Sequence, residues 1–252
     1  MASTLEGTVA LVTGASSGIG AATARQFAAA GAAVALAARR KDRLETLAAE
    51  IGAAGGTALV IECDVTKQDD ASQAVERAVS DLGRLDTLVN NAGVMLLGPT
   101  EGAPVSEWQQ MVELNVLGVL YCAHAATPHL LRAAADGPRH VADMVNISSV
   151  AGRVARNGSG VYSLTKHGVG AFSESLRQEL TKRYVRISLV EPGATATELA
   201  SHNRAEVLES IRSQFGQTMA AEDIADAITY VVTRPRHVAI NEILVRPTEQ
   251  ER

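Results

Sequence analysis

The sequence predicts an α/β protein with one doubly wound parallel sheet of about seven strands, flanked by helices. Short runs of Val, Ile, Leu and Ala alternate along the chain with longer alanine-rich segments of helical periodicity. Runs that are apolar at every position are typical of parallel strands covered on both faces, and right-handed crossovers then place helices on each side. No repeat, low-complexity tract or linker interrupts this alternation, so we expect a single domain over residues 1–252.

The individual elements follow from the same pattern. Each strand is a compact apolar run, and we expect strands at 9–13, 33–37, 58–62, 87–90, 143–148, 186–191 and 240–245. Each helix fills the interval between two strands, and we expect helices near 18–30, 41–54, 69–82, 104–133, 160–183 and 222–233. The Gly-Ala-Ala-Gly-Gly run at 52–56 is typical of a helix-to-strand turn. The segment 195–218 fits the alternation least well, and we expect it to be a mobile insertion.

A glycine-rich turn follows the first predicted strand. It reads Thr-Gly-Ala-Ser-Ser-Gly-Ile-Gly over residues 13–20 and leads directly into the first helix. Glycines allow a tight turn close to a pyrophosphate, and the helix N-terminus offers free N–H groups and a positive dipole end. After the first strand of an alternating chain, this turn predicts a dinucleotide site. The turn lacks Gly-Lys-Ser/Thr, which excludes a P-loop. The residues that we expect at the phosphates are Gly14, Ser16, Ser17, Gly18, Ile19 and Gly20.

The end of the second predicted strand indicates which dinucleotide binds. Folds that prefer NAD place an acidic residue there to bond the ribose hydroxyls, but here Ala38 is followed by Arg39 and Arg40. Without the carboxylate, a 2′-phosphate is not repelled, and guanidinium groups can bind it bidentately. We therefore expect NADP(H); the alternative is that these arginines begin an ordinary solvated helix.

Tyr162 and Lys166 lie four residues apart in a predicted helix, so both side chains project from one face. An ammonium beside a phenol favours the phenolate and lowers the tyrosine pKa from about 10. Such a tyrosine is a candidate proton donor. The pair alone is weak evidence, because this spacing occurs by chance on many helices.

Several motifs in order along the whole chain resemble the short-chain dehydrogenase/reductase family. They are the glycine-rich turn, Asn-Asn-Ala-Gly at 90–93, Ser149, Tyr162 and Lys166. Within the family, residues 90–99, 151–154 and 242–248 look most like NADP-dependent reductases of the clavulanic-acid-dehydrogenase kind and related hydroxy-acid dehydrogenases. The resemblance implies a Rossmann fold, with a cofactor half at about 1–145 and a catalytic half at about 146–252.

The resemblance also implies the roles of four catalytic residues. Tyr162 would exchange a proton with the substrate oxygen, and Ser149 would hydrogen-bond that oxygen. Lys166 would bind the nicotinamide ribose and lower the pKa of Tyr162. Asn115 would hold a water that links Lys166 to solvent; the alternative is a satisfied amide in the core. Ser148 is expected to point to the opposite side.

Further cofactor contacts are implied by the same resemblance. The adenine ring would lie against Asp64 and Val65, and the adenosine ribose and the floor of the cleft against the 91–93 segment. The segment after the sixth strand would hold the nicotinamide carboxamide and the phosphates. The residues so assigned are Asp64, Val65, Asn91, Ala92, Gly93, Pro192, Gly193, Thr195 and Thr197.

The substrate is expected over the nicotinamide, against Met95, Ser149, Val154 and Tyr162. Arg153 and Arg156 could bind a substrate carboxylate at the mouth; the alternative is that both are surface or subunit-contact arginines. The alanine-rich helices at 104–133 and 160–183 are compatible with a homo-oligomer, a dimer or a tetramer.

Composition excludes several other classes. The net charge of −5 argues against a nucleic-acid or membrane-surface binder, and no apolar run has the length of a membrane span. Two cysteines without metal-ligand spacing, and no signal-peptide pattern, indicate a cytoplasmic protein. The six histidines form no zinc motif, so no metal is expected.

We therefore expect an NADP(H)-dependent oxidoreductase that transfers hydride between NADPH and an aldehyde or ketone, with the alcohol as the partner in reverse. Two alternatives remain open. One is a dehydratase or epimerase that uses the cofactor internally, and the other is a regulator that senses NADP(H) without catalysis.

Overall fold

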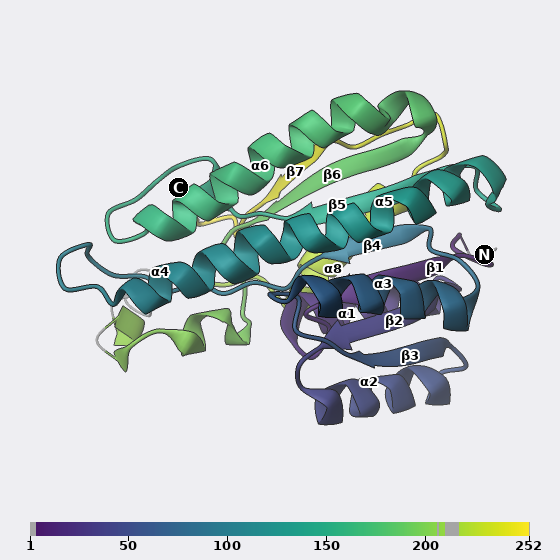
Figure 1. The fold of residues 1–252 in the computed structure, drawn as a ribbon. Coiled ribbons are helices and arrows are strands. Elements are labelled where there is room, and N and C mark those ends of the chain that lie inside the picture. The colour runs from purple at the N-terminus through teal and green to yellow at the C-terminus, as the bar shows by residue number, and fades with distance from the viewer. Residues whose placement is uncertain (1–3, 206, 210–216, 252) are drawn as a thin grey trace.

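The computed structural model describes residues 4–205, 207–209 and 217–251. Its centre is one seven-stranded sheet in the order β3-β2-β1-β4-β5-β6-β7 (Figure 1). All six neighbouring pairs are parallel, which confirms the predicted doubly wound sheet. The strands are β1 (Val9–Thr13), β2 (Ala33–Ala38), β3 (Thr57–Glu62), β4 (Thr87–Asn90), β5 (Ala142–Ile147), β6 (Val185–Pro192) and β7 (Glu242–Val245).

Helices connect the strands at nearly the predicted positions. They are α1 (Gly18–Ala29), α2 (Lys41–Ala53), α3 (Gln68–Leu82), α4 (Val105–Val112), α5 (Gly118–Asp136), α6 (Gly160–Leu180) and α8 (Ala221–Val232). The single helix predicted at 104–133 is wrong in one respect, because a π-helical turn, η1 (Glu113–Leu117), separates α4 from α5. Short 3-10 turns are η2 (Val150–Gly152), η3 (Thr181–Arg183) and η4 (Glu198–His202). Within the described ranges, no helix combines the length and apolarity that crossing a bilayer requires.

The core consists of two layers, one on each face of the sheet. Side chains alternate along β1, so that Leu11 packs with α3, α5 and α6, whereas Ala10 and Val12 pack with α1, α2 and α8. Figure 1 shows α3, α5 and α6 along one side of the sheet. Because both faces are covered, the strands are apolar at almost every position, as the sequence predicts.

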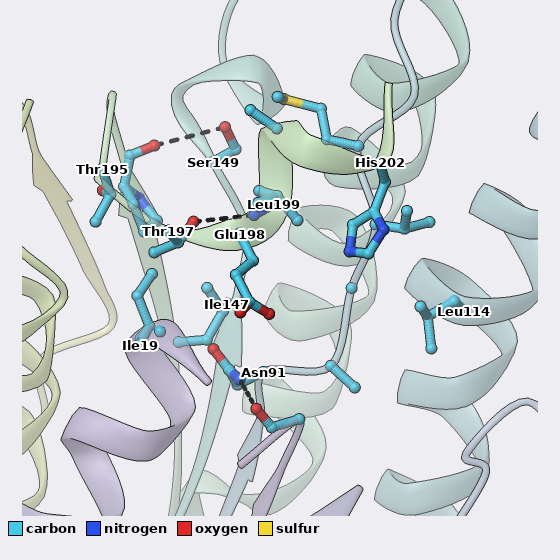
Figure 2. A pocket seen from close by; sticks show the side chains of 18 of the residues that line it. Ile19, Asn91, Leu114, Ile147, Ser149, Thr195, Thr197, Glu198, Leu199 and His202 are labelled. Atoms are coloured by element: carbon cyan, nitrogen blue, oxygen red, sulfur yellow. Dashed lines mark hydrogen bonds between the residues drawn. The ribbon is translucent and has the colours of Figure 1, made fainter. Parts of the chain in front are cut away.

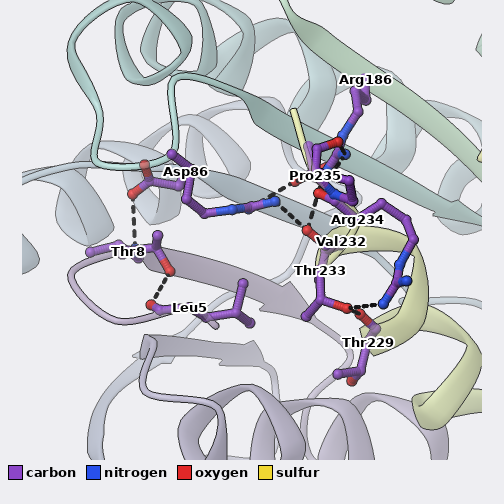
Figure 3. Close-up of polar contacts among 12 residues, drawn as sticks. Leu5, Thr8, Asp86, Arg186, Thr229, Val232, Thr233, Arg234 and Pro235 are labelled. Carbon is purple, nitrogen blue, oxygen red and sulfur yellow. Dashed lines mark hydrogen bonds and ion pairs between the residues drawn. The ribbon is translucent and has the colours of Figure 1, made fainter. Parts of the chain in front are cut away.

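Buried charges gather at the amino edge of the sheet. Asp143 accepts hydrogen bonds from Arg186 Nε at 2.7 Å and Nη2 at 3.0 Å, and from Arg139 at 3.0 Å. Arg186 also donates to the carbonyl of Val232, the last residue of α8, at 3.0 Å and to that of Val238 in the following connection at 2.7 Å (Figure 3). Beside them, Asp86 accepts from the Val9 amide at 2.9 Å and from Arg84. These paired charges tie the strands to the connections between α8 and β7.

The opposite, carboxyl edge carries the loops that build a site. In the strand order, the chain changes direction between β1 and β4, and the loops after these two strands diverge there. A crevice at such a switch point is the usual ligand site of an open α/β sheet. The glycine-rich turn follows β1, and Ser149 follows β5, so the predicted functional residues lie at one edge.

Candidate active site

One cavity of about 620 Å³ opens at this edge. Its walls include residues from the segments after all seven strands, and Figure 2 shows several of the lining side chains. Every predicted catalytic and cofactor residue lines it except Gly20 and Asn115. Residues 206 and 210–216 of the predicted mobile segment lie outside the described residues, so its mobility stays a prediction.

The glycine-rich turn needs glycine for conformation and for space. Gly14 and Gly18 have φ values of +65° and +53°, in the left-handed region. A Cβ on Gly20 would lie 2.5 Å from both the Gly14 oxygen and Asn91 Nδ2. The side-chain amide of Asn91 donates to the Thr13 carbonyl at 2.9 Å and to the Gly14 carbonyl at 3.3 Å, and so holds the turn against the segment after β4. The turn therefore leads α1 into the cleft with its first amides directed toward a ligand.

The two arginines after β2 stand in different surroundings. Arg40 donates to Ser16 Oγ at 3.1 and 2.9 Å, to Ser17 Oγ at 2.8 Å, and to Glu198 at 2.7 Å. Arg39 is exposed, lines the cleft, and makes no hydrogen bond or ion pair with any residue that the structure describes. The structure thus places two guanidinium groups and two hydroxyls at one end of the cleft, a donor set suited to a phosphate.

Two further segments line the cleft, one after β3 and one after β6, and local hydrogen bonds stabilise the conformation of each. Asp64 accepts from the Thr66 hydroxyl at 2.8 Å, and Val65 packs against Gly118, where a Cβ would lie 3.1 Å away. After β6, the Thr195 hydroxyl donates to the Gly193 carbonyl at 3.0 Å.

Ser149, Tyr162 and Lys166 form a buried cluster, each less than a tenth exposed. The Ser149 Oγ accepts from the Ala151 amide at 3.1 Å and donates to the Pro192 carbonyl at 3.5 Å. The Lys166 amino group donates to the Ile147 carbonyl at 2.8 Å and lies 5.9 Å from the centre of the Tyr162 ring. Ser148 also lines the cleft, and its hydroxyl donates to the Lys166 carbonyl at 3.1 Å.

Burial dominates the proton affinities of this cluster. Loss of water around the phenolate raises the pKa of Tyr162 to about 12, and the neighbouring Ser149 hydroxyl opposes that shift. Burial lowers the pKa of Lys166 to about 8. The predicted lowering of the Tyr162 pKa by Lys166 is therefore not found. Desolvation disfavours both charged forms, which leaves Tyr162 a protonated phenol at neutral pH.

Asn115 lies in the π-helical turn and is fully buried. Its Oδ1 accepts from the Val94 amide at 2.8 Å, and its Nδ2 donates to the Val94 carbonyl at 2.8 Å and to the Thr165 hydroxyl at 3.3 Å. Its oxygen would lie 3.2 Å from a Cβ on Gly93, and Lys166 Nζ would lie 3.8 Å from the same point. The π turn thus carries Asn115 to the same corner as Lys166, where it fastens the segment after β4.

The predicted substrate residues separate into two groups. Met95, Val154 and Arg156 line the cleft together with Ser149 and Tyr162. Arg153 is not brought into it, because its guanidinium binds Glu191 at 2.7–2.9 Å and also pairs with Glu242. A buried carboxylate needs such a partner, so Arg153 neutralises Glu191 instead of meeting a ligand.

Several cleft-lining residues were not predicted from the sequence, among them Glu198, His202 and Gln250. Glu198 pairs with Arg40, which lies 158 positions away in the sequence, and Gln250 accepts from the Ala194 amide at 2.8 Å. Asn203, next to His202, binds the backbone of Met95 and Leu97 at 2.8 and 2.7 Å. No local motif marks these residues, because their partners come from distant parts of the chain.

Comparison with known proteins agrees with this geometry. Residues 8–208 match the family model described as short chain dehydrogenase. An uncharacterised oxidoreductase of Staphylococcus saprophyticus is 36% identical over 96% of both chains. A metagenomic short-chain oxidoreductase in complex with NADP is 33% identical, with a TM-score of 0.81 over 97% of this chain and 99% of that one. The closed form of serine dehydrogenase complexed with NADP+ is 30% identical, with a TM-score of 0.88 over 97% of both chains. The chain therefore belongs to the short chain dehydrogenase family of oxidoreductases.

Proposed function

We propose that the protein is an NADP(H)-dependent dehydrogenase/reductase that interconverts a small aldehyde or ketone and the corresponding alcohol. The observation that carries the proposal is the pair of hydroxyl side chains of Ser149 and Tyr162, buried together in the cleft beside Lys166. A hydroxyl donor and a phenol that converge at one point suit a carbonyl oxygen that gains a proton.

The residues of the cleft fit a dinucleotide with a 2′-phosphate. Left-handed glycines form a cradle that side chains would fill, and the helix α1 begins at that cradle. At the ribose end stand Arg39 and Arg40 with the Ser16 and Ser17 hydroxyls, and the last residue of β2 is Ala38 in place of an acid. Two solved relatives that share the fold are complexes with NADP or NADP+, which supports the same choice.

The cofactor, when bound, supplies or accepts the hydride. The chain's own residues handle the proton and the geometry. Tyr162, a protonated phenol at neutral pH, can donate its proton to a substrate oxygen during reduction. Ser149 directs a hydrogen bond to the same point, and Lys166 and Asn115 fix the segments on either side.

The apolar wall of Met95 and Val154 suits a substrate with an apolar body. Arg156 lines the same cavity and supplies a cation at its mouth, which supports a substrate carboxylate. Aldehydes with and without a carboxylate, compared in wild type and Arg156→Ala, test this part. A loss confined to the carboxylate-bearing substrates is expected, and equal losses on both kinds would contradict it.

The proposed function is tested by the nicotinamide absorbance of NADPH with a panel of aldehydes and ketones. We expect Tyr162→Phe to abolish turnover but to keep NADPH binding, because it removes only the hydroxyl. The matched control is Tyr121→Phe, which deletes a hydroxyl from a partly buried tyrosine of α5 outside the cleft. Turnover that survives in Tyr162→Phe would refute the assignment. NADPH binding without turnover on any substrate would favour the regulator, and turnover without net NADPH consumption would favour the dehydratase or epimerase.

Cofactor preference is tested separately. Arg39→Asp places a carboxylate at the ribose end, and we expect it to lower the affinity for NADPH and to raise the relative use of NADH. If the ratio of NADPH use to NADH use does not change, Arg39 does not bind the 2′-phosphate.

A further inference from the structure

Glu198 places a carboxylate on the arginines of the cofactor end. It begins the short turn η4 after β6, and it points from that turn into the cleft (Figure 2). One of its oxygens lies 2.7 Å from Arg40 Nη1, and the other lies 2.6 Å from Arg43 Nη1. The hydrogen bonds from Arg40 and Arg43 lower the pKa of Glu198 to about 2, so it carries its charge at every working pH.

Most donors of Arg40 are engaged in this arrangement. Its Nε and Nη2 bind the Ser16 and Ser17 hydroxyls and its Nη1 binds Glu198, so four of the five N–H groups of the guanidinium have partners. The two hydroxyls can turn and donate to a phosphate, because a hydroxyl is both donor and acceptor. The carboxylate can only accept. A phosphate that binds Arg40 therefore meets a like charge at Glu198, and one anion has to give way.

Arg43 provides a place for the carboxylate to remain. It lies one helical turn after Arg40, at the start of α2, and it does not line the cleft. When Arg40 binds a phosphate, Glu198 can stay paired with Arg43. The exchange then breaks the Arg40–Glu198 ion pair and retains the Arg43–Glu198 ion pair. The side chains of Arg43 and Glu198 are 45% and 43% exposed, so their ion pair is weak in water and little free energy is lost when Glu198 moves.

The segment that carries Glu198 reaches across to the substrate wall. Thr197 caps η4 by accepting from the Leu199 amide at 3.3 Å, and Asn203 follows the turn. Asn203 accepts from the Leu97 amide at 2.7 Å and donates to the Met95 carbonyl at 2.8 Å. One short segment is thus fastened at the arginines and at the substrate wall.

We propose that Glu198 is an internal competitor for the cofactor phosphate at Arg40, and that it weakens the binding of NADP(H) without affecting the binding of NAD(H). The inference rests on the proposed function, since the phosphate concerned is that of NADP(H). Glu198 acts here as a residue that sets phosphate selectivity, and it does not take part in proton transfer.

Calorimetric titration of the purified protein tests this inference without any turnover. The probes are adenosine 2′,5′-bisphosphate and NADPH, compared with adenosine 5′-monophosphate and NADH. Glu198→Gln removes the charge and keeps the shape. We expect it to tighten binding of the two 2′-phosphate probes about two- to fivefold, the range for loss of an exposed ionic competitor, and to leave the other two unchanged.

The matched control is Glu50→Gln. Glu50 pairs with Arg25 at 2.7 Å, is 49% exposed, and lies on α2 outside the cleft. Glu50→Gln changes the net charge by the same amount as Glu198→Gln. If both variants bind the 2′-phosphate probes more tightly to the same degree, the effect comes from net charge alone and the inference is overturned. In an Arg40→Gln background, the gain from Glu198→Gln should shrink, because the shared guanidinium is gone.

The outcomes separate this inference from the proposed function. Wild type that prefers NADPH, together with Glu198→Gln that binds it no more tightly, overturns the inference alone. Wild type that binds NADH as well as NADPH overturns the cofactor preference in the proposed function alone. Wild type that binds no NADPH, together with Glu198→Gln that binds none either, overturns both. Selective tightening for the 2′-phosphate probes supports both.

Discussion

Lys166 allows a direct test of what its buried position costs. Its side chain is only slightly exposed, and burial lowers its pKa from 10.5 to about 8. Each tenfold loss of proton affinity corresponds to about 1.4 kcal/mol, so a charged Lys166 destabilises the folded state by about 3 kcal/mol at pH 7. Replacing the lysine also removes its hydrogen bond to the Ile147 carbonyl, which costs about 1 kcal/mol. Lys166→Met should therefore raise the free energy of unfolding by about 2 kcal/mol and abolish turnover.

The effect has a defined dependence on pH. The folded pKa lies below the unfolded value, so the cost is fully present below about pH 8 and is relieved as the pH rises toward 10.5. Wild type should gain stability relative to the variant over this window. By about pH 9.5, the charge-related part of the difference should fall below half its value at pH 7.

Urea unfolding of wild type and Lys166→Met at pH 7 and 9.5 measures the difference, because other groups with shifted pKa values contribute equally to both proteins. Lys182→Met is the control for removing an exposed lysine, and we expect it to change stability by less than about 0.5 kcal/mol. A variant less stable than wild type at pH 7 would refute the reasoning, as would a gap that is the same at both pH values.

Two further predictions concern the two edges of the sheet. Asp143→Asn leaves the Arg186 guanidinium buried without its carboxylate, and should lower the free energy of unfolding by about 3–5 kcal/mol in urea titrations; a loss below about 1 kcal/mol would show that the backbone carbonyls suffice. Gly20→Ala drives a methyl group into the Gly14 oxygen, and should weaken NADPH binding by tenfold or more in calorimetry. Unaltered affinity there would mean that the turn is not the pyrophosphate cradle.

The sequence predicts the sheet well because its signal is local. Val9–Thr13 and Thr87–Asn90 begin and end as predicted. Both strands are buried at every position, and their centres are apolar because the sheet is covered on both faces. The helix predicted at 104–133 hides a π-helical turn. That turn accompanies the bonding of Asn115 to Val94, 21 residues earlier, and such a tertiary partner leaves no periodic trace.

The site shows the same division. The glycine-rich turn and the Tyr162–Lys166 spacing are short motifs, and the structure brings both to one cleft. Glu198 is an ordinary acidic residue in the sequence, and only folding brings it to Arg40. Conversely, Arg153 is close to Ser149 in the sequence, but its guanidinium pairs with Glu191 and does not line the cleft. The physiological substrate, the cytoplasmic location, the oligomeric state and the closest subfamily stay predictions.

The two edges of the sheet have different roles, and this matters for protein engineering. The amino edge, where Asp143 and Arg186 are locked together, contributes to folding and touches no ligand-lining residue. The carboxyl edge carries the loops of the cleft. Libraries that vary Met95, Val154 and Arg156 can therefore search new substrates while the paired charges at the far edge preserve the scaffold.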